Sequence, residues 1–263
     1  MMLEIENLSK RFGGLVALDE VSLEFASKTV TAIIGSNGAG KTTLFSVIAG
    51  FQKPDSGRVI LKSDDVIGNS PRLVGMDITA MTPDRIALQG IGVLFQDVRV
   101  FDKLTALANV AVGAKNQPGE NPFNCVFRPK LVAVREKEVL EKSLYYLDYV
   151  GLADKAHLWA EQLSYGQQKL LAIARLLAGD SKVLLLDEPT SGVHPDMIDK
   201  LLLLIQQLAN DDGRAVIMIE HNLNVVKRIG DLVYLMAGGR IEAFGKPPEV
   251  LCDEKLVETL PML

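Results

Sequence analysis

The stretch GSNGAGKTT at residues 35–43 limits what this chain can fold into more than any other feature. It fits the pattern G-x-x-x-x-G-K-[ST], which belongs to phosphate-binding loops. The apolar, β-branched run TVTAIIG (29–35) precedes it, and TTLFSVIAGF (42–51), which has helical spacing, follows it. A buried strand that turns through glycines into a helix aims backbone N–H groups at an anion. The sequence therefore predicts an α/β protein with a phosphate-binding loop.

The residue types inside this loop suit a nucleoside triphosphate. Gly35 and Gly40 let the backbone curl, so that its N–H groups point inward. We expect the Lys41 ammonium to reach the β- and γ-phosphates, and the Thr42 hydroxyl to ligate Mg²⁺. The helix that follows adds its positive N-terminal end. The predicted nucleotide-binding residues of this segment are Gly35, Ser36, Asn37, Gly38, Ala39, Gly40, Lys41, Thr42 and Thr43.

Polar residues end other apolar runs, and parallel strands bring such ends to one edge of a sheet. Asp187 ends KVLLLD, so we expect it to hold Mg²⁺ directly or through water, while Glu188 polarises an attacking water. Gln96 in VLFQD is predicted to orient water and Mg²⁺. His221 in VIMIEH is predicted to donate a hydrogen bond to the γ-phosphate. Glu188, His221 and Gln96 are therefore the catalytic candidates, and Asp187, Gln96 and Thr42 the metal ligands.

A second anion-type motif, LSYGQQK, lies at residues 163–169 and opens an apolar-patterned helix. Ser164 offers a hydroxyl, Gly166 a backbone N–H and Gln167 an amide, all at the positive end of that helix. Residues 35–43 already form a better phosphate loop. The sequence therefore poses the question of which phosphate the second motif serves.

Strands and helices alternate along the chain, which is typical of a mostly parallel α/β sheet. Residues 63–82 are polar and irregular and are predicted to form a loop or a short insertion. Residues 97–160 carry few strand signals and are predicted to form an inserted, mainly helical region. The remaining predictions are strands at 3–5, 21–25, 58–62, 91–97, 183–189 and 214–220, helices at 134–152 and 196–210, and a hairpin at 232–245.

Composition excludes several classes of protein. The 263 residues carry a net charge of −5, which argues against nucleic acid as a partner. The two cysteines, Cys125 and Cys252, lack metal-ligand spacing and are expected to be free thiols. No apolar run approaches the ~20 residues that cross a bilayer, and MMLEIENLSK is not expected to be a secretory signal.

Taken in order, GSNGAGKTT, Gln96, LSYGQ, LLLDEP and His221 resemble the nucleotide-binding subunit of an ABC transporter over essentially the whole chain. The resemblance implies a single ABC ATPase domain, residues 1–263. Its RecA-like P-loop NTPase core and antiparallel β-subdomain would comprise 1–96 and 161–263, and its inserted α-helical subdomain 97–160. It also implies ATP and Mg²⁺ as cofactors, with Phe12 stacking on the adenine.

The same resemblance answers the question of the second motif. In this family two subunits pack head to tail, and the signature loop of one closes on the ATP held by the other. Ser164, Gly166 and Gln167 would then complete a site on another subunit. The implied partners are integral-membrane permease subunits, a second ATPase subunit and, indirectly, a solute-binding protein. A heterodimer is favoured over a homodimer, and the expected location is peripheral, on the cytoplasmic face of the inner membrane.

Subfamily features are LSYGQQ, KRFGGLVAL, IEHN and the segment after Gln96, which are similar to Liv-type importers of branched-chain and other amino acids. A urea or lipopolysaccharide transporter ATPase is the alternative, followed by a soluble ABC ATPase and a P-loop kinase. Tyr165 stands where most of the family has glycine, and His194 where aspartate is common. No role is transferred to His194.

Three helical segments outside the motifs carry weaker signals. The apolar residues of 98–110 (Val98, Phe101, Leu104 and Leu107) predict either a groove for a permease helix or packing on the chain's own core. YYLDY at 145–149 is predicted to be core. REKEVLEK at 135–142 is predicted to be a solvated face with charge pairs.

Overall fold

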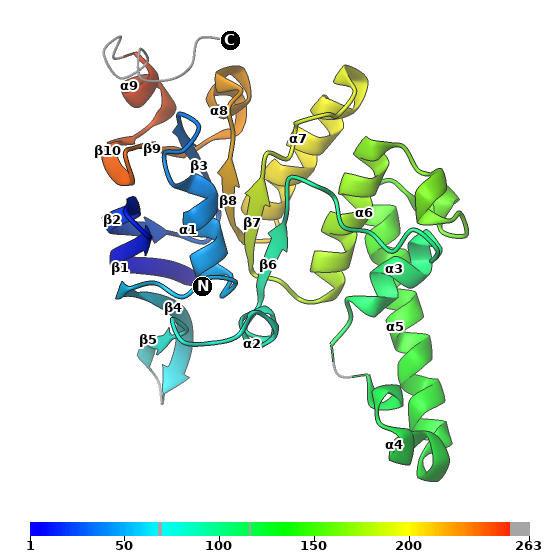
Figure 1. The fold of residues 1–263 in the computed structure, drawn as a ribbon. Helices are drawn as coiled ribbons and strands as arrows, with labels where there is room; N and C mark the ends of the chain where they lie inside the picture. The colour runs from blue at the N-terminus through cyan, green and yellow to red at the C-terminus, as the bar shows by residue number, and fades with distance from the viewer. Residues whose placement is uncertain (68–69, 116, 253–263) are drawn as a thin grey trace. The chain divides into compact units, whose positions relative to one another are not determined.

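The computed structural model describes residues 1–67, 70–115 and 117–252 (Figure 1). They fall into two compact units. The first comprises the described residues of 1–93, 182–191 and 199–252, and the second those of 94–181 and 192–198.

A mostly parallel sheet forms the centre of the first unit, with strand order β10-β9-β3-β8-β7-β6. Every residue of β7 and β8 is buried, as expected for strands with apolar runs and neighbours on both sides. The sheet confirms the predicted α/β class, and only β10 is shown antiparallel to its neighbour, β9. The strands are β3 (Thr29–Gly35), β6 (Ile91–Leu94), β7 (Val183–Asp187), β8 (Ala215–Ile219), β9 (Leu232–Ala237) and β10 (Arg240–Gly245).

The predicted strand at 91–97 ends earlier than expected. Strand β6 stops at Leu94, so Gln96 lies in the loop beyond it. The predicted hairpin at 232–245 is confirmed as β9 and β10, joined by Gly238 and Gly239 in left-handed conformations. The helices outside the second unit's bundle are α1 (Lys41–Ile48), α2 (Pro83–Leu88), α7 (Pro195–Asn210), α8 (Leu223–Ile229) and α9 (Pro247–Leu251).

A second, antiparallel sheet in the first unit has the order β2-β1-β4-β5. Its strands are β1 (Met2–Phe12), β2 (Leu15–Phe25), β4 (Ser56–Ile67) and β5 (Ser70–Asp77). The prediction of a loop at 63–82 was therefore wrong for residues 63–67 and 70–77, where the backbones pair from Ile60↔Asp77 outward. Polar residues such as Ser63 hide this hairpin in the sequence, because an edge strand does not need an apolar face.

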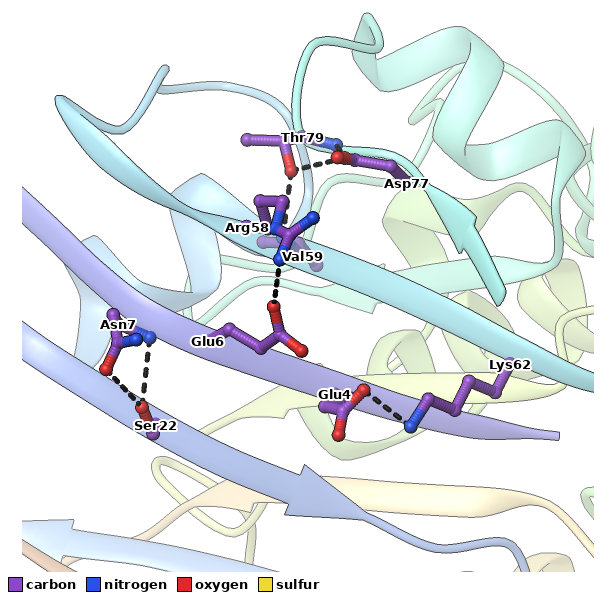
Figure 2. A network of polar contacts seen from close by, with 9 residues as sticks. All are labelled: Glu4, Glu6, Asn7, Ser22, Arg58, Val59, Lys62, Asp77 and Thr79. Atoms are coloured by element: carbon purple, nitrogen blue, oxygen red, sulfur yellow. Dashed lines mark hydrogen bonds and ion pairs between the residues drawn. The ribbon is translucent and has the colours of Figure 1, made fainter. Parts of the chain in front are cut away.

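Charge pairs cross the exposed face of this sheet (Figure 2). Glu6 lies directly opposite Arg58 on β4, and their charged groups are 2.9 Å apart. Glu4 makes a second pair with Lys62, at 2.6 Å. Such solvent-accessible pairs contribute at most about 1 kcal/mol each, so they select the strand register more than they stabilise the fold.

The second unit is helical. Helices α3, α5 and α6 pack against one another, and residues such as Leu147 and Leu171 are fully buried. Its helices are α3 (Ala106–Val112), α4 (Pro122–Phe127), α5 (Pro129–Tyr149) and α6 (Tyr165–Ala178), with short 3₁₀ turns at Pro118–Glu120, Ala153–Lys155 and Ala160–Gln162. The unit extends past the predicted limits of 97–160 because the apolar face of α6 packs on α3 and α5.

Two predictions about burial concern helix α5, and they have different outcomes. Its charged stretch is solvated, as predicted, with pairs Arg135–Glu138 and Lys137–Glu141. The YYLDY prediction was partly wrong, because Tyr145 is 62% exposed although Leu147 is fully buried.

The β9–β10 turn provides a stability test with neighbouring glycines. A Cβ on Gly239 would lie 2.9 Å from the Ala17 carbonyl oxygen, whereas one on Gly238 would meet nothing within 4 Å. We expect Gly238→Ala to lower the free energy of unfolding by about 1 kcal/mol, the cost of a left-handed residue. Gly239→Ala should cost roughly 1–3 kcal/mol more because of overpacking. Urea unfolding of both variants measures this, and equal losses would contradict it.

Candidate functional site

The loop after β3 is packed so closely that only glycine fits at two positions. A Cβ on Gly35 would lie 2.1 Å from the Met236 carbonyl oxygen, and one on Gly40 would lie 2.3 Å from that of Ala17. Gly40 also has a φ of 101°, which side chains rarely adopt. Asn37 and Gly38 at the crest of the loop are exposed. Strands β2 and β9 thus fix the loop from below, while its crest faces solvent.

Lys41 begins α1 and is 6% exposed. Its ammonium donates hydrogen bonds to the carbonyl oxygens of Gly35 (2.8 Å) and Ser36 (2.9 Å), so the side chain closes the loop on itself. Burial lowers the pKa of Lys41, and the negative charges of Glu188 and Asp187 oppose that shift. The loop lysine and both predicted carboxylates therefore share one electrostatic environment. Of its neighbours, Thr42 is exposed and Thr43 half-buried.

The predicted carboxylates lie where β7 ends. Asp187 is its last residue and is 7% exposed. Glu188 follows with a φ of 46°, a left-handed conformation that costs a non-glycine residue on the order of 1–2 kcal/mol. Its N–H donates to the Ile219 carbonyl at 3.0 Å, which anchors the backbone to the end of β8. Backbone strain held in this way is frequent at functional sites.

His221 is brought to Glu188 from the neighbouring strand. It lies just past the end of β8, and its Nε2 is 2.9 Å from Oε1 of Glu188. Both side chains keep some exposure, 31% for His221 and 19% for Glu188. Two of the three predicted catalytic residues thus contact each other in an accessible position.

Glu220 is a residue of this site that the sequence reasoning missed. Its side chain is buried, and Oε1 accepts hydrogen bonds from the Thr190 hydroxyl (2.7 Å) and the Thr190 N–H (3.1 Å). It thereby ties the turn after Glu188 to the end of β8. The only hint in the sequence is an acidic residue at the end of the apolar run MIEH, and that pattern does not show that its side chain points inward.

Phe12, the predicted adenine platform, is 45% exposed at the end of β1. The Lys10 ammonium lies 5.4 Å from the centre of its ring. The ring therefore has accessible area for stacking.

The second motif opens α6, in the second unit. Ser164 is the N-cap: its hydroxyl accepts from the Gln167 N–H (3.3 Å), and the Gln167 side chain accepts from the Ser164 N–H (3.0 Å). Gly166 is buried, and a Cβ there would lie 3.3 Å from the Val193 side chain. Ser164 and Gln167 thus stabilise the helix start, which holds the motif in its predicted shape.

Gln96 also belongs to the second unit and is exposed. In the adjoining segment, Phe101 is 49% exposed. The Arg175 guanidinium lies over its ring, with Cζ 5.5 Å from the ring centre. Helix α3 begins only at Ala106, so residues 98–105 are not helical. His194 is exposed, and its Nδ1 lies 3.4 Å from Asp196. The permease groove stays a prediction.

The sheet, the glycine loop and the lysine define a P-loop nucleotide-binding protein, and comparison with known proteins narrows the class. The family model described as ABC transporter matches residues 18–191. The branched-chain amino acid transport ATP-binding protein BraF of Pseudomonas aeruginosa is 34% identical over 249 residues, 95% of this chain and 93% of the relative. This chain belongs to the ABC transporter family and is one of its ATPase subunits.

Solved structures agree. A nucleotide-free ATP-binding cassette from an ABC transporter matches with a TM-score of 0.80 and 35% identity over 98% of both chains. A dimeric bacterial ABC transporter cassette matches with a TM-score of 0.71 and 26% identity, over 93% of this chain and 98% of the other. Among the described residues, no helix is long and apolar enough to span a membrane.

Lys41→Met tests the loop lysine. Because burial disfavours its charge, we expect the unliganded variant to unfold within about 1 kcal/mol of the wild type although two hydrogen bonds are lost. The rise in melting temperature caused by Mg-ATP should disappear. Lys53→Met, which removes an exposed charge, is the control. A thermal shift with Mg-ATP that survives in Lys41→Met would contradict the role of Lys41.

The lowered pKa of Lys41 also predicts a pH dependence. The unfolded chain holds this proton up to the ordinary value of 10.5, whereas the folded chain releases it at lower pH. Wild-type stability should therefore gain relative to Lys41→Met as pH rises through the window below 10.5. Urea unfolding of both proteins at pH 8 and pH 10 measures this difference. A difference that stays constant would overturn the assignment.

Proposed function

We propose that this chain is the motor subunit of an ABC importer for branched-chain or other amino acids, binding and hydrolysing ATP. The observation that supports ATP hydrolysis is the contact between Glu188 and His221. These residues follow the ends of adjacent strands, and the charge of Glu188 acts on Lys41. The relatives named as branched-chain amino acid transport proteins support the substrate class.

The first unit binds the nucleotide. The phosphates lie along residues 35–43, whose backbone N–H groups and α1 N-terminus attract negative charge. Lys41 exchanges its two loop carbonyls for phosphate oxygens and so supplies a charge that is already desolvated. Phe12 stacks on the adenine.

A magnesium ion fits the donors available. Thr42 and Asp187 would offer the oxygens that Mg²⁺ prefers, Gln96 is the proposed third protein ligand, and phosphate oxygens and water would complete the shell. When bound, the ion would supply charge neutralisation at the phosphates.

Hydrolysis depends on the strand ends. Glu188 accepts a hydrogen bond from the attacking water and polarises it. Without nucleotide, the His221 ring contacts the Glu188 carboxylate at 2.9 Å. With ATP bound, its N–H donates to the γ-phosphate instead, which leaves the carboxylate to the water. Glu220 fixes the turn that follows Glu188 through Thr190. Gln96 orients the water.

Two such subunits complete the site. Ser164, Gly166 and Gln167 present the start of α6 to the ATP of the other subunit. A similar bacterial ABC transporter cassette is dimeric, which supports a two-subunit site. The second subunit is a different ATPase, or a second copy of this chain. ATP favours the closed dimer by mass action, and hydrolysis releases it.

The dimer works at the cytoplasmic face of the membrane, bound to permease subunits that receive solute from a binding protein. The choice of solute lies in those partners. Urea and lipopolysaccharide remain alternatives that the ATP chemistry alone does not separate.

Glu188→Gln tests the shared site. This variant removes the charge that polarises water but keeps the size of the side chain, so we expect ATP binding with hydrolysis reduced roughly 100-fold or more, in the range of general-base losses. It should form an ATP-dependent dimer, alone or mixed with its sister ATPase, in size-exclusion chromatography. Glu242→Gln, at an exposed position of β10, is the charge-matched control. If ATP gives no dimer in either mixture, the shared site is wrong.

The transport role is tested by purifying the tagged chain from detergent-solubilised membranes of its own cell. We expect two permease proteins and a second ATPase to accompany it, because in the proposed importer separate membrane subunits carry the solute. Reconstituted with those partners, it should import branched-chain amino acids on addition of ATP. Recovery with ribosomes or nucleic acid would contradict the importer assignment.

A further inference from the structure

The loop that contains Gln96 is fastened by side chains from the helices of its own unit. The Tyr165 hydroxyl donates to the Gln96 carbonyl oxygen at 2.8 Å. Arg175, also on α6, donates to the Arg99 carbonyl. Asn109 of α3, fully buried, accepts from the Phe101 N–H at 2.8 Å and returns a bond to its carbonyl. Tyr165 is the fastening nearest to Gln96.

Tyr165 is itself held on both sides. A Cβ on Gly192 would lie 3.0 Å from the tyrosine ring, so ring and backbone are already in contact. Gly192 has a φ of 69° and lies in the segment that follows Glu188 in the chain. The ammonium of Lys169, a buried residue one turn along α6, lies 5.2 Å from the ring centre. The hydroxyl therefore has little freedom to leave the Gln96 carbonyl while these contacts persist.

We propose that Tyr165 is a positioning residue for Gln96, which links the start of α6 to the loop that orients water and metal. This rests on the proposed function of Gln96 and of the LSYGQ turn. Tyr165 lies between Ser164 and Gly166, so whatever displaces that turn displaces the Gln96 carbonyl with it.

Tyr165→Phe tests the link, because it removes the hydroxyl and leaves the ring against Gly192 and Lys169. The loss of one hydrogen bond should lower kcat roughly three- to tenfold and raise the Mg²⁺ concentration for half-maximal rate. The KM for ATP and the melting temperature should stay close to wild type. A merely structural role would move the melting temperature instead.

The matched control is Tyr234→Phe. The Tyr234 hydroxyl also donates to a backbone carbonyl, that of Glu24 at 3.1 Å, in the first unit. The Tyr234 hydroxyl also accepts from the Glu24 N–H at 3.4 Å. The variant thus removes a tyrosine hydroxyl and its bond to a backbone carbonyl away from the proposed site, so we expect kcat and the Mg²⁺ requirement to remain unchanged. An equal loss of kcat in both variants would overturn the proposal.

A double-mutant cycle with Gln96→Ala separates this inference from the proposed function. Gln96→Ala keeps the carbonyl and removes the amide, so Tyr165→Phe should cause no further loss of kcat in that background. If the two effects multiply, or if Tyr165→Phe alone is fully active while Gln96→Ala is impaired, the link is wrong and the role of Gln96 stands. If Gln96→Ala is fully active, the role proposed for Gln96 fails, and the link fails with it.

Discussion

The buried ammonium of Lys41 is the constraint on which the first unit depends. An ammonium is rarely buried without partners, since desolvation costs it several kcal/mol. Here two loop carbonyls satisfy it, and the carboxylates at the end of β7 balance its charge. The loop can turn its carbonyls inward only because Gly35 and Gly40 let it press against β9 and β2. The close packing of the glycines and the carbonyls turned towards Lys41 thus fit the burial of one positive charge below the candidate phosphate site.

The same constraint explains why much of this site was predictable. A parallel strand that is buried on both faces is an apolar run, so β3, β7 and β8 can be recognised in the sequence. The residues at their carboxyl ends then mark the edge of the sheet where the candidate site lies. The loop pattern then predicts what the edge holds. The geometry between Glu188 and His221 was only implied, because register decides which strand ends face each other.

What could not be predicted depends on direction and context. No local pattern tells that Glu220 points inward to Thr190, or that Glu188 adopts a left-handed conformation. The β4–β5 hairpin was missed because its strands are polar where they pair. The predicted helical region, 97–160, was too short because α6 was assigned to the core together with its motif. The apolar face of α6 instead packs on α3 and α5 of the second unit.

In the proposed two-chain site, the start of α6 would act as a preformed set of hydrogen-bond donors. The cap by Ser164 and Gln167 satisfies part of the helix terminus, so the turn is formed before any nucleotide arrives. A preformed donor set loses little entropy on closing, and only the approach of two subunits remains to be driven. Permease partners that hold both ATPases side by side would raise their effective concentration. The binding of ATP then needs to supply only the free-energy difference between the open and closed dimers. A modest loss of contacts on hydrolysis is enough to favour the open dimer again.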